Sequence, residues 1–288
     1  MRYSKPITEI IPRRYSCRTY LEQPIAVEKR LAIENFLFSL RVGPLGASVR
    51  FKLLAASEQD RSSLKRLGTY GFIRRATGFI VGAVESSEKN LEDYGYLMES
   101  AILFATDLGL GTCWLGGSFT KSSFARKISM RNGEIMPAVT AVGYAAEKSR
   151  LKDLIRQQVG ADRRLPWRKL FYRARFGEPI SSEEAGAYAA PLEMVRLGPS
   201  ASNKQPWRVI RDGKKWHFYL QRSRSYGRGS LTFKLLRLAD LQRVDMGIAM
   251  CHFEQTAREL GLDGKWVIEE PAVEKPDELT EYTVSWIG

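Results

Sequence analysis

The feature that most constrains this chain is an approximate internal repeat. Three pairs of short segments recur in the same order at a constant separation of 152 residues (245 − 93, 260 − 108 and 266 − 114). The pairs are Asp93-Tyr94-Gly95 with Asp245-Met246-Gly247, Leu108-Gly109-Leu110 with Leu260-Gly261-Leu262, and Trp114 with Trp266. Self-similarity at a fixed spacing indicates repeated structural units.

A second set of matches lies upstream at a separation of 155 residues (196 − 41 and 179 − 24). It pairs Arg41-Val42-Gly43-Pro44 with Arg196-Leu197-Gly198-Pro199, and Pro24-Ile25 with Pro179-Ile180. The two sets keep one order and drift by only three residues. They predict two homologous halves, about 1–155 and 156–288, which a chain of 288 residues can pack around one shared core.

Hydrophobic periodicity predicts an α+β texture in each half. The two longest apolar helices are each followed by a glycine, Gly109 or Gly261, which is a common helix terminator. We expect these helices to pack on each other at the centre of an intramolecular pseudo-dimer. The predicted helices are 27–40, 91–108 and 238–260, and the predicted strands are 77–84, 137–144, 207–210, 216–220 and 282–287.

Composition excludes several classes of protein. No stretch reaches the roughly 18 apolar residues of a transmembrane helix, and the N-terminus lacks an apolar signal core, so we expect a cytoplasmic protein. The three cysteines, Cys17, Cys113 and Cys251, are far apart and lack C-x-x-C spacing. With only two histidines, a disulfide framework or a bound metal is not expected.

The chain is strongly basic. Its net charge is +13, and residues 163–175 carry six basic side chains. This excess fits either a phosphate-bearing partner, nucleic acid or an anionic membrane, or a solvated basic surface with a site for a phosphorylated cofactor. The chain has no recognised nucleic-acid-binding signature, which favours the second interpretation.

Three segments are candidates for binding a ligand. In Arg14-Tyr15-Ser16-Cys17-Arg18, two guanidinium groups and a hydroxyl can converge on one phosphate, although a basic helix end would look the same. The turn 198–207 is rich in small hydroxyl and amide groups, as an ordinary loop also is. Glycines in 109–117 would let the backbone approach a flat ligand; the alternative is that they only end a helix and precede a strand and a turn.

Together these segments resemble the FMN-dependent nitroreductase family. The R-x-S-x-R stretch resembles the family's N-terminal phosphate motif, and 199–207 resembles its P-S-x-x-N-x-Q-P-W turn. The segments 108–116 and 136–144 resemble the family's glycine segment and the strand before its basic tail. The similarity spans most of the chain, keeps the family's order, and is closest to a subgroup in which two copies of the fold are fused.

The resemblance implies a nitroreductase-like fold and a set of FMN-binding residues. Arg14, Ser16 and Arg18 would hold the phosphate and lower ribityl chain, with Lys148 and Arg150 added from the tail. Residues of the turn would line the ring or ribityl chain, and the glycine segment would face the ring; Tyr70 and Gly71 are further candidates. The full expected set is Arg14, Tyr15, Ser16, Arg18, Leu115, Gly116, Gly117, Lys148, Arg150, Pro199, Ser200, Ala201, Ser202 and Asn203.

Each half retains only part of this set. In the first half, 44–49 replaces the P-S-A-S-N turn, and in the second half Lys169, Phe171 and Arg173 replace the R-x-S-x-R residues. We therefore expect one FMN per chain in a composite site, a degenerate opposite cleft, and a monomer. No catalytic side chain is expected, because the flavin carries the chemistry.

The expected function is hydride transfer from NAD(P)H through FMN to a small acceptor such as a nitroaromatic or a quinone. The alternatives are a non-catalytic flavin-binding protein, a nucleic-acid-associated basic protein, and flavin-dependent dehydrogenation of a cyclic or peptide substrate, because a fold does not fix a function.

Overall fold

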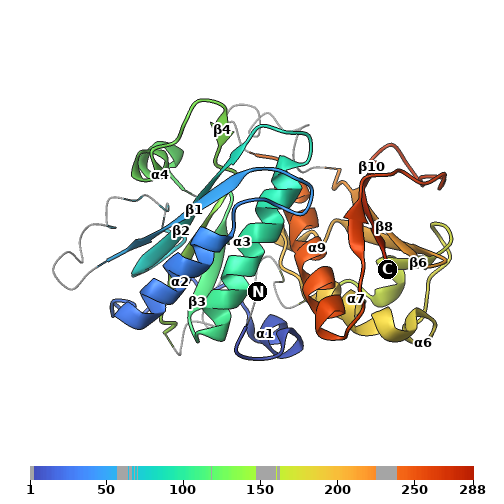
Figure 1. Ribbon diagram of the computed structural model, residues 1–288, viewed down its shortest axis with the longest axis horizontal. Coiled ribbons are helices and arrows are strands. Elements are labelled where there is room, and N and C mark those ends of the chain that lie inside the picture. Colours follow the sequence, from blue (N-terminus) through green and yellow to red (C-terminus); the bar gives the residue numbers. More distant parts are fainter. Residues whose placement is uncertain are drawn as a thin grey trace.

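The computed structural model describes residues 3–56, 64, 67, 69, 71–117, 119–146, 160, 163–224 and 239–288. Figure 1 shows two sheets on opposite sides of a pair of central helices, α3 (Asn90–Asp107) and α9 (Leu241–Glu259). The first sheet and its helices come from the N-terminal part of the chain, and the second sheet comes from the C-terminal part.

The first sheet has five strands in the described residues. Its order is β1-β2-β5-β3, with the short β4 paired to the end of β2, and all these pairs are antiparallel. Helices cover both faces, since α2 and α3 contact β1 and β2 on one side and α4 contacts β2 from the other side. The bounds are α1 Ile7–Arg13, α2 Val27–Ser39, β1 Val49–Ala55, β2 Gly78–Glu85, β3 Gly111–Leu115, α4 Lys121–Ile128, β4 Glu134–Ile135 and β5 Val139–Gly143.

The second sheet has the order β6-β7-β8-β10-β9. The β6–β7 pair is parallel and the other pairs are antiparallel. Helix α7 packs against α9, and α9 contacts β7 and β8 of this sheet. The bounds are η1 Trp167–Lys169, β6 Phe171–Arg173, α6 Ser182–Ala185, η2 Gly186–Tyr188, α7 Ala189–Leu197, η3 Ala201–Asn203, β7 Trp207–Asp212, β8 Lys215–Gln221, β9 Lys265–Val267 and β10 Thr280–Ile287.

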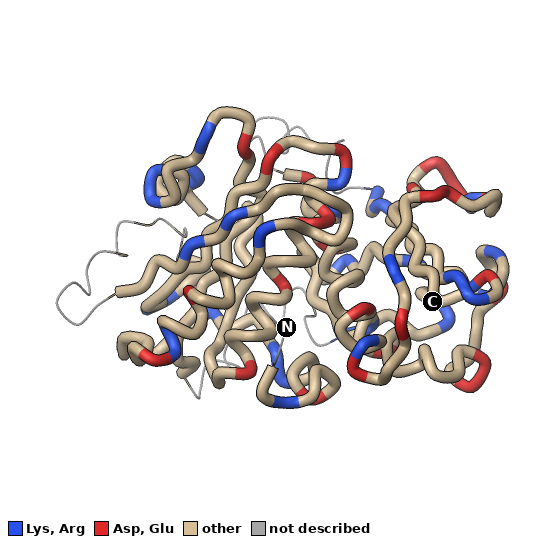
Figure 2. The backbone as a smooth tube through the Cα atoms, viewed as in Figure 1, with Lys and Arg blue, Asp and Glu red and all other residues tan. Residues whose placement is uncertain are grey.

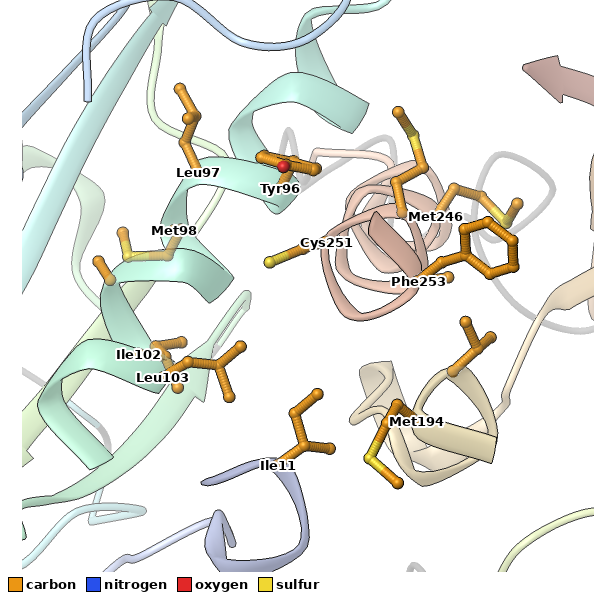
Figure 3. Packing of buried hydrophobic residues seen from close by; sticks show 14 of the residues in the cluster. Ile11, Tyr96, Leu97, Met98, Ile102, Leu103, Met194, Met246, Cys251 and Phe253 are labelled. Atoms are coloured by element: carbon orange, nitrogen blue, oxygen red, sulfur yellow. The ribbon is translucent and has the colours of Figure 1, made fainter. Parts of the chain in front are cut away.

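Helices α3 and α9 touch backbone to backbone. A Cβ atom on Gly95 would lie 2.1 Å from the Val244 carbonyl oxygen, and one on Gly247 would lie 1.9 Å from the Glu92 carbonyl oxygen. The two contacts are equivalent at an offset of 152 residues (244 − 92 and 247 − 95). Figure 3 shows the side chains around this contact, where Cys251 points from α9 toward α3. Only glycine permits so close an approach.

Most element boundaries agree with the periodicity to within two residues, and Gly109 and Gly261 have the positive φ angles of helix terminators. Two expectations need correction. The α9 helix begins at Leu241 rather than at 238, which lies outside the described residues. In α2, Val27 and Leu31 are exposed although they are apolar residues of the predicted helix, because at 3.6 residues per turn they lie on a different side of the helix from the buried Ile33 and Leu37.

The distribution of charged residues and the free state of the cysteines indicate no further element of the fold in the described residues. Figure 2 shows Lys and Arg distributed over both ends of the molecule and interspersed with acidic positions. Cys17, Cys113 and Cys251 are free and buried. In the described part of the chain, no helix has the length and apolar character needed to cross a bilayer, and no three His, Cys, Asp or Glu side chains form a cluster able to hold a metal ion.

We predict that Gly247→Ala lowers the free energy of unfolding by at least about 2 kcal/mol, because the neighbouring Glu92 backbone cannot yield as a flexible side chain would. Urea unfolding measures the change. Glu28→Ala, on the exposed surface of α2, is the control and should shift stability by no more than about 0.5 kcal/mol. A Gly247→Ala protein as stable as the wild type would contradict the close helix contact.

Candidate functional site

A pocket of about 390 Å³ is lined by segments from both ends of the chain. Its walls come from the end of α1 and the segment after it, the end of β3, the loop that follows α7, and the first turns of α9. The volume is in the range typical of small-molecule sites. The expected residues that line it are Arg14, Tyr15, Ser16, Arg18, Leu115, Gly116, Pro199, Ser200, Ala201, Ser202 and Asn203.

Some expected residues are not brought to the pocket. Gly117 is exposed and is not among the lining residues, and neither is Gly71. Lys148, Arg150 and Tyr70 lie outside the described residues.

The N-terminal wall is an extended segment fixed to the start of β3. Ser16 forms a parallel bridge with Thr112, and the Cys17 N–H donates to the Thr112 carbonyl at 2.8 Å. Gly111 lies against this segment, since a Cβ there would be 3.0 Å from the Cys17 Cβ. The pairing places Arg14, Ser16 and Arg18 at one wall of the pocket.

The end of β3 approaches the start of α9 at a second glycine contact. A Cβ atom on Gly116 would lie 2.4 Å from Leu241 Cδ1. Both residues line the pocket, so a side chain at position 116 would displace the α9 wall. The backbone at Leu115 and Gly116 is therefore kept close to the opposite wall.

The turn after α7 has an unusual backbone. Ser202, Asn203 and Gln205 have φ angles of 50°, 54° and 49°, in the left-handed region that residues other than glycine seldom adopt. Such conformations persist only where surrounding contacts enforce them. The Gln205 N–H donates to Ser200 Oγ at 2.8 Å, which closes the turn on itself.

Side-chain amides tie this turn to the segment that precedes β6. The Asn203 amide donates to the Gly160 carbonyl at 2.7 Å and to the Arg163 carbonyl at 3.0 Å. Gln205 Oε1 accepts the Leu165 N–H at 2.8 Å. The Asn203 side chain thus supports the pocket wall through two hydrogen bonds that its sequence position did not predict.

An aspartate at the start of α9 also anchors the turn. Asp245 is buried, lines the pocket, and accepts the Ala201 N–H with both carboxyl oxygens, at 3.0 and 3.2 Å. Asp93, which is 152 residues earlier, accepts the N–H groups of Leu45 and Ala47 at 2.8 and 2.7 Å. Burial raises the pKa of Asp245 well above its usual range and raises that of Asp93 to about 6.

A buried polar cluster lies behind the pocket. Trp114 lines the pocket, and its Nε1–H donates to Glu99 Oε2 at 2.7 Å. Arg14 Nε lies 3.8 Å from Glu99 Oε1, and His252 Nε2 lies 3.1 Å from the same oxygen. Burial disfavours the Glu99 carboxylate, but these partners more than compensate and hold its pKa below the usual value.

Sequence reasoning missed much of the lining. Arg164 belongs to a basic stretch that was noted only for its charge, and its guanidinium donates to the Leu197 carbonyl at 3.0 Å and to Asn203 Oδ1 at 3.3 Å. Cys113, Trp114 and Ala138 lie within segments that resemble the family but were not singled out, and the others reach the pocket through the packing of their elements. The missed residues besides Arg164 are Ile11, Pro12, Phe72, Cys113, Trp114, Ala138, Leu197, Leu241, Val244, Asp245 and Ile248.

Comparison with known families identifies the family of this chain. The model of a family described as "Putative TM nitroreductase" matches residues 6–257. The chain belongs to this nitroreductase family. No curated protein matches the sequence of this nitroreductase-family chain.

Solved structures include several nitroreductases similar to this chain. A putative nitroreductase from Thermotoga maritima is 22% identical over 100% of this chain and 95% of its own, with a TM-score of 0.61, and therefore shares the fold. A nitroreductase with bound FMN from Bacteroides fragilis is 20% identical over 52% of this chain and 94% of its own, with a TM-score of 0.39. A putative nitroreductase in complex with FMN from Desulfovibrio desulfuricans is 21% identical over 50% and 88%, with a TM-score of 0.40.

We predict that Asp93→Asn flattens the pH dependence of stability in this nitroreductase-family protein. The pKa of Asp93 is about 6 in the folded chain against 3.8 for an ordinary aspartate, so the folded state binds the extra proton between these values. The contribution of Asp93 to the free energy of unfolding is therefore complete below pH 3.8 and is lost as the pH rises through 6.

Urea unfolding of both proteins across this range measures the effect. The free energy of unfolding of the wild type minus that of the variant should decrease with rising pH and then level off. Parallel pH profiles of the two proteins would contradict a raised pKa.

Proposed function

We propose that the chain binds one FMN in the pocket and transfers hydride from NAD(P)H to a small acceptor such as a nitroaromatic or a quinone. The observation that carries the proposal is the convergence of two distant motifs. Arg14, Ser16 and Arg18 lie in the same pocket as Pro199-Ser200-Ala201-Ser202-Asn203, although more than half the chain separates them. Membership of the nitroreductase family supports an oxidoreductase.

The donors in the pocket fit the parts of FMN. Guanidinium groups and a hydroxyl are the donors that a phosphate dianion requires, and Arg14, Ser16 and Arg18 supply them on one wall. The apolar Leu115, Leu241 and other lining side chains offer a surface for a flat ring system. When bound there, FMN would supply the hydride chemistry, while these residues bind and orient it and exclude water.

We also propose that the chain is a pseudo-dimer of two homologous halves, 1–155 and 156–288, with a single site. The reciprocal contacts at Gly95 and Gly247 have the form of an isologous interface, in which equivalent residues exchange contacts. One chain would then supply both walls of the pocket, so that a monomer suffices for binding.

Aromatic rings at the equivalent positions of the second half support the proposal of a single site. Phe171, which occupies the position equivalent to Ser16, is fully buried and packs edge-on against Trp167 with ring centroids 4.6 Å apart. Trp266, which is equivalent to Trp114, packs against Phe218 and Trp286 at 5.2 and 5.0 Å. A buried ring in place of the Ser16 hydroxyl removes a donor that a phosphate would need, which supports one FMN per chain.

We predict that purified protein, supplied with FMN, holds about one FMN per chain, as the single composite site requires. The bound flavin should lose its oxidised absorbance when NADH or NADPH is added without oxygen, and regain it when a quinone or nitroaromatic follows. Absorbance and quantitation of released flavin measure both steps. Two FMN per chain would contradict the degenerate cleft, and bound flavin that neither nucleotide reduces would contradict the reductase.

We predict that Arg18→Ala raises the Kd for FMN by about tenfold or more, because a charge-assisted hydrogen bond is lost. Ser202→Ala should raise it by a few-fold, as expected for a neutral donor. Fluorescence titration with FMN measures both. Arg173→Ala, which changes the exposed residue equivalent to Arg18 in the second half, is the matched control and should leave the Kd unchanged. Unchanged binding in both site variants would place the flavin elsewhere.

A further inference from the structure

Two of the three cysteines lie side by side at the wall of the pocket. Ser16 forms a parallel bridge with Thr112, and the Cys17 N–H donates to the Thr112 carbonyl at 2.8 Å. Cys17 and Cys113 are the next residues along these two paired segments, so their Cα atoms lie about 5 Å apart, which is the spacing of neighbouring strands. A disulfide can span this separation without a large movement of either backbone.

The two side chains also point to the same face of the first sheet. Side chains alternate along a strand, so position 111 shares a face with Cys113. A Cβ atom on Gly111 would lie 3.0 Å from Cys17 Sγ, which places the Cys17 thiol on that face as well. Burial raises the pKa of the Tyr20 phenol, and Cys113 and Cys17 add to the increase, as expected where both thiols lie near one phenol oxygen.

Burial separates this pair from bulk solvent but not from the pocket. Cys17 is 0% and Cys113 is 2% exposed, and Cys113 lines the pocket. Both are thiols, with Cys17 Sγ 3.3 Å from the Thr19 carbonyl oxygen and Cys113 Sγ 3.6 Å from that of Trp114. A molecule bound in the pocket would therefore lie against Cys113, whereas a bulky oxidant or reductant in solvent would not reach the pair.

The second half of the chain has no equivalent pair. At the offsets of the repeat, Tyr172 stands at the position of Cys17 and Lys265 at that of Cys113 (172 − 17 and 265 − 113). The third cysteine, Cys251, lies on α9 and faces α3, with its Sγ 3.3 Å from Ser100 Oγ (Figure 3). The paired thiols therefore occur only beside the pocket that we propose for FMN.

We propose that Cys17 and Cys113 form a dithiol–disulfide couple that exchanges two electrons with the bound flavin. The proposal rests on the FMN site proposed above and adds a redox centre to it. Oxidation joins the two Sγ atoms, releases both thiol protons and gives two electrons to oxidised FMN. In the reverse direction reduced FMN gives two electrons to the disulfide, which takes up two protons and opens to the two thiols. The oxidised chain thus accepts four electrons for each FMN, instead of two.

The first experiment asks whether the disulfide forms. FMN-loaded protein is oxidised with diamide, denatured, and labelled with a maleimide, and its peptides are identified by mass spectrometry. We expect only Cys251 to be labelled, and one disulfide to link the peptides that contain Cys17 and Cys113. Protein kept reduced should be labelled at all three cysteines. Labelling of all three cysteines after oxidation would overturn the proposal.

The second experiment counts electrons. Under anaerobic conditions, diamide-treated protein should need two equivalents of dithionite per bound FMN for complete reduction, whereas protein kept reduced should need one. Because the wild type supplies both samples and the count is made per FMN, the stability of a variant does not enter this comparison. One equivalent in both samples would show that the pair does not exchange electrons with the flavin and would overturn the proposal.

Variants assign the extra electrons to the pair. Cys17→Ser should need one equivalent after the same oxidation, because one thiol cannot close the disulfide. Cys251→Ser is the matched control, since it also replaces a buried thiol, and it should still need two equivalents. A Cys17→Ser protein that needs two equivalents would overturn the proposal. A wild type that binds no FMN would refute the proposed function itself, whereas one that binds FMN but forms no disulfide would refute only this inference.

Discussion

The contact between α3 and α9 is the constraint on which the rest of the structure depends. Gly95 and Gly247 allow the two backbones to touch, and any side chain at either position would meet a carbonyl oxygen within 2.1 Å. Everything that lines the pocket from α9, including Leu241 and Asp245, is positioned by this contact relative to β3 and the N-terminal segment. A separation of the two helices would therefore shift the α9 residues that line the pocket.

The same contact carries polar pairs with different chemistry on its two sides. Each side has an aspartate that anchors a turn, Asp93 on one side and Asp245 on the other, so the supporting framework is shared. The pairs nearer the centre differ, because Glu99 lies 3.1 Å from His252 on one side, whereas Ser100 lies 3.3 Å from Cys251 on the other. A shared framework thus carries different side chains on its two sides, with a pocket on one side and packed aromatic rings on the other.

The sequence revealed those parts of the fold and site that local patterns determine. The central helices, most strands and the glycine terminators follow from periodicity, and the R-x-S-x-R and P-S-A-S-N segments do line one pocket. The exposure of Val27 and Leu31 was missed, because apolar residues occur on more than one side of α2 and the structure buries only the side that carries Ile33 and Leu37. Arg164 was missed for a similar reason, since only its contacts with Leu197 and Asn203 distinguish it from the other basic residues around it.

The turn at 199–205 illustrates why motif letters alone do not give side-chain roles. Three residues without glycine's freedom adopt positive φ angles, which costs free energy in the absence of compensating contacts. Three side chains provide those contacts. Asp245 accepts the Ala201 N–H, Gln205 accepts the Leu165 N–H, and Asn203 donates to two carbonyl groups. The amide and acidic groups are thus used to hold the backbone, which leaves the exposed hydroxyl of Ser202 and the backbone of the turn to face a ligand. A wall fixed in this way would lose little conformational entropy on binding the proposed flavin, and such preorganisation favours a single orientation of a flat molecule.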